Sequence, residues 1–325
     1  MRFRRRVPAL LGILIFLAAI AVVVEVRKHA PPEPARLLPG ADGFIYANLS
    51  WMRHVDIAKH LPPVAHDPQY EQFIQATGFD FERDLQKVAV AIHYASPATH
   101  NQTRYSWIFV AHIDGNRLRA YLKGLAKSVE TYRSIDIYNI PIDDRTLRVA
   151  ILGVDMVTAS NHDESWVIHG IIDRSRKLAS PFGGPALLRQ NYKYVPQLPL
   201  PSLGWAIFKL DSSETGPVNA PFPVGIPATI VASVRYLGAV HFRAEALTES
   251  DTAAEQLASQ METFLQVFHS AEVSVGGQTP DPDFKRALDS VKVEQKKNRA
   301  VLTAVIPTEL IRKLVAEAPS QLSPK

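Results

Sequence analysis

Short apolar runs, separated by turn residues, begin at Gly43 and predict most of the regular structure of this chain. Runs of four to nine apolar and alternating residues are typical of β-strands. Longer stretches carry apolar residues at helical spacing, as in Leu118, Tyr121, Leu122 and Leu125. We expect strands at residues 43–48, 87–94, 105–113, 135–139, 147–152, 156–159, 203–210, 229–236, 239–247, 291–295 and 300–306. We expect helices at residues 50–60 and 68–76, and helices that begin near residues 116, 163, 251 and 308.

These elements follow a recurring order of two strands and one amphipathic helix. Consecutive strands with short turns pair antiparallel, so the pattern predicts an α+β fold whose antiparallel sheet, or sheets, carries helices on one face. Residues 81–125 and 284–317 share this pattern closely enough to suggest an internal repeat.

The strand at residues 239–247 predicts which face is covered. Val240, Phe242 and Ala244 alternate with His241 and Arg243, so one side should pack in the core and the other should meet water. A charged sheet face is usually an ordinary solvated surface, but it could also bind a ligand or partner.

The first 28 residues have a different pattern, because residues 7–24 form an apolar run of 18 residues without a charge. This approaches the roughly 20 residues that a helix needs to cross a bilayer. Four arginines precede the run, and only Arg27 and Lys28 follow it within the next few residues, which predicts a cytoplasmic amino terminus and a domain outside the cytoplasm. The residues that define this expected single-pass inner-membrane anchor are Arg2, Arg4, Arg5, Arg6, Leu10, Leu11, Ile13, Phe16 and Val24.

A cleaved signal peptide is the alternative for this segment, since Ala19 and Ala21 have the spacing of a cleavage site. Cleavage there would leave three exposed valines, so we favour the anchor. Either outcome places the remaining chain outside the cytoplasm. Residues 29–41, with four prolines, then predict an extended spacer.

Charge and cysteine content narrow the function classes. The formal net charge is +4, and the four arginines of the amino-terminal arm account for it, since residues 29–325 carry 30 basic and 31 acidic side chains. We therefore expect no nucleic-acid partner. The chain has no cysteine, which excludes disulfides, thiolate nucleophiles and iron–sulfur ligation.

No catalytic or metal-binding motif is present in the sequence. Two histidines, His93 and His112, lie on neighbouring predicted strands, but no histidine pair has helical ligand spacing, so we expect no metal and no cofactor. The Asp143-Asp144 pair and the Asp281-Pro282-Asp283 run are interpreted as turns.

Residues 181–228 contain nine prolines and one predicted strand, and long loops of this kind are often functional. Tyr192, Tyr194 and Trp205 lie in or beside these loops. With His241 and Arg243, they form the predicted ligand or partner surface.

Several segments, namely Leu37-Leu38-Pro39 with GFIYANLS, TGFDFERDL, Tyr132 with IDIYNI, IIDRSR, PFGGPALLR and DSVKVEQ, resemble a family of uncharacterised bacterial proteins. The family has a single-pass anchor and repeated strand-strand-helix units. The resemblance implies an envelope location and no particular activity.

The sequence thus predicts a membrane-anchored extracytoplasmic binding or scaffolding protein, with envelope proteins or an apolar ligand as possible partners. The alternative is an envelope-acting hydrolase without a recognisable motif. We expect an arm and transmembrane helix at 1–28, a spacer at 29–41, a first half at 42–180, proline-rich loops at 181–228, a second half at 229–318 and a tail at 319–325.

Overall fold

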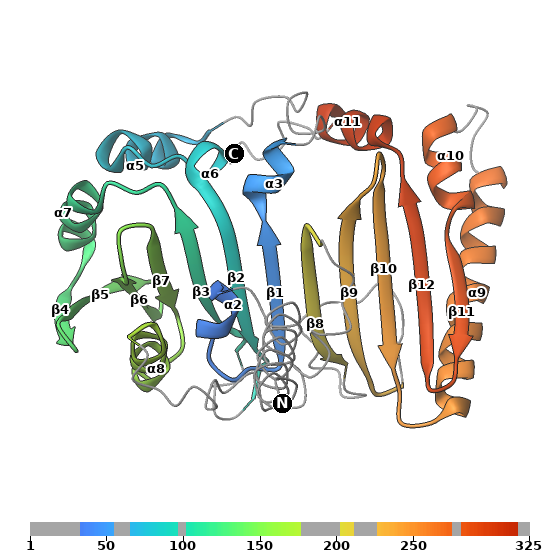
Figure 1. Cartoon of the computed structure of the whole chain (residues 1–325), viewed down its shortest axis with the longest axis horizontal. Coiled ribbons are helices and arrows are strands. Elements are labelled where there is room, and N and C mark those ends of the chain that lie inside the picture. Colours follow the sequence, from blue (N-terminus) through green and yellow to red (C-terminus); the bar gives the residue numbers. More distant parts are fainter. Residues whose placement is uncertain are drawn as a thin grey trace, which may run out of the picture.

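A single sheet of twelve strands organises the described part of the chain (Figure 1). The computed structural model describes residues 33–54, 66–96, 102–176, 202–210, 226–274 and 281–317. The strand order is β11-β12-β10-β9-β8-β1-β2-β3-β7-β6-β5-β4, and every neighbouring pair is antiparallel. The expected α+β class with a large antiparallel sheet is confirmed.

The strands are β1 (Gly43–Asn48), β2 (Leu85–His93), β3 (Arg104–Ala111), β4 (Ser128–Tyr132), β5 (Ile135–Ile142), β6 (Arg145–Ile151), β7 (Met156–Ser160), β8 (Gly204–Leu210), β9 (Ala228–Tyr236), β10 (Val240–Leu247), β11 (Lys292–Lys296) and β12 (Arg299–Ile306). The helices are α2 (Glu33–Leu37), α3 (Leu49–His54), α5 (Pro68–Thr77), α6 (Phe81–Asp84), α7 (Gly115–Leu125), α8 (Trp166–Ser175), α9 (Asp251–Ser274), α10 (Pro282–Asp289) and α11 (Thr308–Glu317).

Aspartates fix the start of several helices. The carboxylate of Asp114 accepts hydrogen bonds from the first backbone amides of α7, and Asp67 does the same for α5. Asp281, which the sequence placed in a turn, caps α10 in this way. These bonds satisfy amides that have no partner within the helix.

The sheet consists of two halves, of seven and five strands, that both begin with a three-stranded meander. In the first half, β1, β2 and β3 form a meander, and β7 returns beside β3 after α7. In the second half, β8, β9 and β10 form a meander, and β12 returns beside β10 after α9. The halves join where β1 pairs with β8. The junction is tight, because a Cβ atom at Gly204 would lie 2.8 Å from the carbonyl oxygen of Tyr46.

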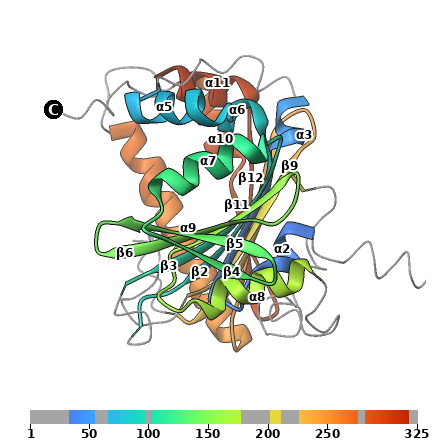
Figure 2. The ribbon, with the colours of Figure 1, turned by 90° about the vertical axis from the view of Figure 1, so that its left-hand side faces the viewer.

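Helices cover both faces of the sheet, so the prediction of helices on one face is wrong. On β5, Ile137 packs with Ile168 of α8, whereas the next residue, Tyr138, packs with Leu118 of α7. Successive residues of a strand point to opposite faces. Figure 2 shows α7 and α9 on one side of the sheet and α2 and α8 on the other. The prediction relied on alternation in one strand, residues 239–247, whereas β5 is apolar on both faces.

Helix α2 lies within the predicted proline-rich spacer. Its Ala35 is buried, and Leu38 just after it is buried as well; both pack against Phe44 of β1. Residues 1–32, including the predicted anchor, lie outside the described residues. Within the described ranges, no helix is both long enough and apolar enough to cross a bilayer.

Candidate functional site

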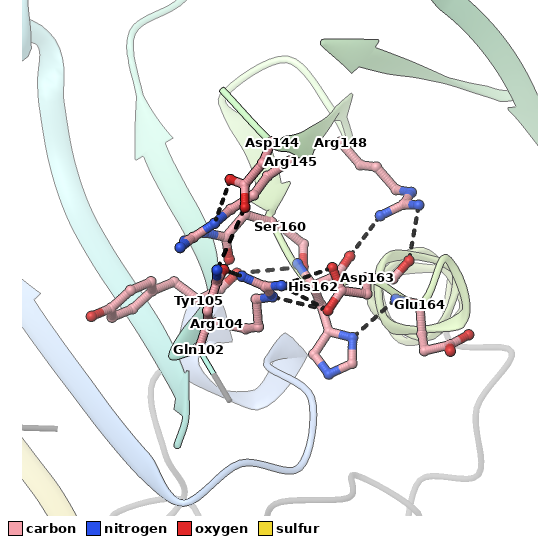
Figure 3. A network of polar contacts seen from close by, with 11 residues as sticks. Gln102, Arg104, Tyr105, Asp144, Arg145, Arg148, Ser160, His162, Asp163 and Glu164 are labelled. Carbon is pink, nitrogen blue, oxygen red and sulfur yellow. Dashed lines mark hydrogen bonds and ion pairs between the residues drawn. The ribbon is translucent and has the colours of Figure 1, made fainter. Parts of the chain in front are cut away.

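Two places on the sheet could carry function: a buried polar cluster at one end of β2, β3 and β7, and an extended apolar face. The polar cluster contains several buried polar side chains, and Figure 3 shows the contacts around Arg104 and His162. Its buried members are His93, Arg104, Ser106, Ser160 and His162. Because burying polar groups is costly unless they are paired, each contact in the cluster must be followed.

Arg104 is the centre of this cluster. Its side chain is 4% exposed and forms a forked pair with Asp163, at 3.0 Å from Nε to Oδ2 and 3.0 Å from Nη2 to Oδ1. Arg148 donates to the carbonyl oxygens of His162 and Asp163 at 2.6 and 3.1 Å. The two arginines therefore hold the loop that leads from β7 into α8.

His93 and His162 lie face to edge, with ring centroids 4.9 Å apart. Burial, together with the smaller effect of the neighbouring His162, lowers the pKa of His93 to about 4. Burial also lowers the pKa of His162, against the raising effect of Asp163. Both rings are thus neutral near pH 7. The backbone amide of Glu164 donates to Nδ1 of His162, which assigns the ring proton to Nε2.

The cluster holds the structure together and offers little chemistry. The hydroxyl groups of Ser106 and Ser160 lie 2.9 Å apart and bond to each other. His112, the histidine considered as a partner of His93, lies at the opposite end of the β2–β3 hairpin, next to Gln86. Among the described residues, no group of three or more histidine, aspartate or glutamate side chains could hold a metal ion.

The apolar face is the second candidate, and a single cross-strand row shows its extent. The row runs through directly paired residues on all twelve strands, and every member is apolar. Its members are Val129, Tyr138, Val149, Ala159, Trp107, Val90, Ile45, Ala206, Ala232, Ala244, Leu302 and Val293. The next row on one side is also apolar across the central strands: Phe109, Val88, Ala47, Gly204, Val234, Phe242 and Ala304.

Helices bury the two ends of this face. Leu118 and Leu122 of α7 pack on Val149, Val157 and Ala159. At the other end, α9 packs through its Leu257 and Ala258, and its sheet partners are Ala228, Ala246 and Ala300.

The centre of the face is only partly covered. On β1, Phe44 and Tyr46 point to the opposite face and are 1% and 7% exposed, whereas Ile45 between them is 36% exposed. Val90 on β2 and Phe208 on β8 lie on the same face as Ile45 and are half-buried. Apolar side chains left partly in water at the centre of a sheet mark a binding surface more often than a packing fault.

The predicted surface residues fall in three different places. Tyr192 and Tyr194 lie outside the described residues. Trp205 is buried in the core and stacks on Tyr46 with ring centroids 5.7 Å apart. His241 and Arg243 lie on the sheet face opposite to the apolar one, since their strand partners are Arg235 and Ser233. The structure does not bring these residues together, and their ligand-binding role stays a prediction.

A hollow of about 530 Å³ lies beside the start of α7. Its charged lining is balanced, with Asp114 and Asp136 against Arg119 and Arg176. The Asp114 carboxylate already accepts two backbone amides of α7. This hollow therefore has no clear preference for a cation or an anion.

Comparison with protein-family models gives no match, and comparison with curated proteins gives none either. Among solved structures, crystal form III of TP0453 is similar over 88% of this chain and 98% of that chain, with 8% sequence identity and a TM-score of 0.43. Crystal form I of TP0453 gives the same coverage and identity with a TM-score of 0.38.

Sequence reasoning missed the central residues of the apolar face, above all Ile45 and Phe208. The segment GFIYA indicated this face, because the residues that point to either side of the strand are apolar. Such a strand needs cover on both faces. The sequence predicts six helices, which are too few to cover both faces of its eleven predicted strands.

Proposed function

We propose that this chain is a membrane-tethered binding protein of the extracytoplasmic space, and that its apolar face receives the acyl chain of a lipid. The observation that carries the proposal is the contrast on β1 between buried Phe44 and exposed Ile45. The tether and the compartment come from the apolar run at residues 7–24 and the arginines before it.

The size of the face favours a lipid chain over a protein partner. The strands β2, β1, β8, β9 and β10 span about 24 Å at ~4.8 Å per strand, and three alternate positions cover about 17 Å, which gives roughly 400 Å². A stable protein interface buries about 800 Å² on each partner. The face carries no charged residue in its two apolar rows, so it offers nothing to a polar ligand.

The floor of the face also suits a chain-like ligand. Ala206, Ala232 and Ala244 continue the row from Ile45, and they are small. Trp107 on the same row stacks on Tyr105, with ring centroids 5.6 Å apart. These two large rings stand higher than the alanines and border the face on one side. Small side chains between larger ones leave room above the sheet for atoms of a ligand.

A hydrolase, the alternative suggested by sequence, would need a nucleophile next to a general base. In the polar cluster, the two serine hydroxyls bond to each other, and the histidine rings face each other. The described residues therefore give the hydrolase no specific support.

A photoactivatable lipid with a diazirine in its acyl chain tests the proposal. The full chain is reconstituted in vesicles with this lipid, irradiated and mapped by peptide mass spectrometry. We expect adducts on peptides that contain β1 and β8, and a several-fold loss in the variants Ile45→Asp and Ala206→Trp. Val154→Asp, at an 89% exposed position in the β6–β7 turn, is the matched control. Adducts confined to residues 7–24, or unchanged in both variants, would refute lipid binding on this face.

The topology has its own test. A phosphatase fused after Lys325 should be active only outside the cytoplasm. An inactive fusion of a stable, membrane-bound protein would overturn the proposed orientation.

A further inference from the structure

The face opposite to the apolar one changes character between the two halves of the sheet. In the first half it carries α2 and α8, and it combines the apolar residues packed against them with the buried polar cluster. In the second half its strand positions are mostly polar or charged. The basic face, as we call it, consists of Arg235, Arg243, Lys292, Lys296 and Arg299.

The basic face has a surplus of positive charge. Only Glu245 and Glu294 lie among its five basic side chains on these strands. Glu245 is shared, since Arg243 and Arg299 both bond to it, at 2.7 and 3.0 Å. Glu294 pairs with Lys296 at 2.7 Å. Arg235 and Lys292 have no ion-pair partner among the described residues, so positive charge is left for an external partner.

The chain enters the domain on this same side. Helix α2 is the first described element, and it packs on the face that continues into the basic face. Eight residues separate Val24, the end of the predicted anchor, from Glu33. Eight residues reach at most about 28 Å. A domain tethered this closely can turn one face toward the bilayer.

We propose that the basic face docks on the anionic phospholipid headgroups of the membrane that holds the chain. Basic side chains near a bilayer are attracted to acidic lipids. The inference uses the predicted anchor and a different surface from the apolar face, which would point away from the bilayer in the docked state, so that a lipid would have to leave the bilayer to reach it. Lysines on the edge strand β11 also discourage edge-to-edge pairing, but this does not account for Arg235 and Arg243 on inner strands.

Energy transfer from a dye on the domain to acceptor lipids tests the docking. The chain has no cysteine, so Val305→Cys, on the same side as the basic face, and Glu262→Cys, on α9, each give one labelling position. The full chain is reconstituted in neutral vesicles and in vesicles with roughly 30% anionic phospholipid. We expect anionic lipid to raise transfer from position 305 at least twofold more than from position 262.

Salt and substitutions make the test specific. At ~1 M salt, where the Debye length is about 3 Å, the difference between the two positions should vanish. The triple variant Arg235→Gln, Lys292→Gln and Lys296→Gln should lose more than half of it. The control triple Arg119→Gln, Lys123→Gln and Lys127→Gln, at the α7 side of the sheet, should keep it.

Equal responses at both positions, or a response that survives salt and the triple variant, would overturn the docking. If the basic face instead binds a poly-glutamate peptide and ignores anionic vesicles, its partner is a protein and the membrane proposal fails. Neither result affects the lipid cross-linking on the apolar face, which uses a different surface and a different probe.

Discussion

The two halves of the sheet present different chemistry on the same side. Following one cross-strand row, the first half supplies Ile137, Ala150, Thr158, Ile108, Ala89 and Tyr46, and Trp205 continues it at the junction. The second half continues the row with Ser233, Arg243, Thr303 and Lys292. The first half is covered by α2 and α8 on this side, whereas the second is charged. Two halves that both begin with a three-stranded meander therefore carry two different surfaces on this side.

The other side of the sheet is apolar across both halves. The two halves therefore differ in chemistry on one side only. On this apolar side, whether a side chain is buried depends on its position along the sheet and not on its residue type. Where α7 and α9 pack, the apolar residues are buried, and between them Ile45 is not. The predictions below test this difference in cover, starting with the largest expected effect.

Substitutions at two neighbouring residues of β1 should show the largest difference in their effect on the free energy of unfolding. Phe44→Ala removes a fully buried ring and should lower the free energy of unfolding by about 3–5 kcal/mol. Ile45→Ala should cost less than about 1.5 kcal/mol, because part of that side chain is already in water. Urea denaturation followed by tryptophan fluorescence measures both. Equal losses would mean that the two faces are equally packed.

Acid should lower the free energy of unfolding through His93, which lies in the first half of the sheet. Its pKa is about 4 in the folded chain, against 6.5 in an unfolded one. Between these values the unfolded state binds the extra proton, so stability is full above pH ~6.5 and falls as the pH drops toward ~4, by ~3 kcal/mol in total. His93→Phe should flatten this part of the pH profile.

His66→Gln is the control for this pH experiment. A hydrogen bond to Glu71 raises the pKa of the half-buried His66. Its contribution is therefore present at low pH and is lost as the pH rises, which is the opposite sign. If His93→Phe leaves the acid-dependent loss unchanged, the histidine pair is not its source.

The ion pairs of the two halves should differ in strength. Arg104→Gln leaves Asp163 without its forked partner in a buried site, and we expect a loss of ~2–3 kcal/mol, below the usual range because Asp163 is partly exposed. Arg299→Gln in the basic face, where the arginine is 37% exposed, should cost less than about 1 kcal/mol. A double-mutant cycle with Asp163→Asn and with Glu245→Gln isolates each pair energy.

Alanine substitutions at two glycines should show the smallest difference in their effect on stability. Gly78 and Gly238 both have a left-handed backbone, with φ of 74° and 79°. Gly238→Ala should cost ~1 kcal/mol, since no atom lies near its Cβ position. Gly78→Ala should cost more, because its Cβ would lie 2.7 Å from Nη1 of Arg117, whose guanidinium donates to the carbonyl oxygens of Gln75 and Ala76. Thermal unfolding of the two variants compares them.

The hydrophobic pattern predicted the strands well because most of them are continuous apolar runs. The predicted strand at residues 43–48 coincides with β1, and the strand at residues 203–210 differs from β8 by one residue. Strand β4 (SVETY) was missed; like β11, which was predicted, it has no apolar run, and it lies at the edge of the sheet, where it pairs with β5. Helix α10 was missed because Asp281 and Pro282 look like a turn, although both also suit the start of a helix.

The site could not be predicted to the same extent. His93 and His162 are 69 positions apart, and their contact depends on β3 lying between β2 and β7. Trp205 was expected in a strand beside the proline-rich loops and on a binding surface, but its strand lies at the centre of the sheet and its side chain is buried. Exposure of Ile45 depends on where two helices end, and no local pattern encodes this. Only the alternation of His241 and Arg243 with apolar neighbours gave the correct face.

The junction between β1 and β8 has a consequence for any attempt to divide the chain. Each half alone would end in one of these two strands, with unpaired backbone amides and carbonyls along a mostly apolar margin that carries a single charged residue, Lys209. Such margins pair readily with other chains. In the intact protein the two margins are paired with each other by backbone hydrogen bonds. The outer edge at β11 carries lysines. The halves would therefore be expected to self-associate when expressed separately, whereas in the joined chain neither margin is open to another chain.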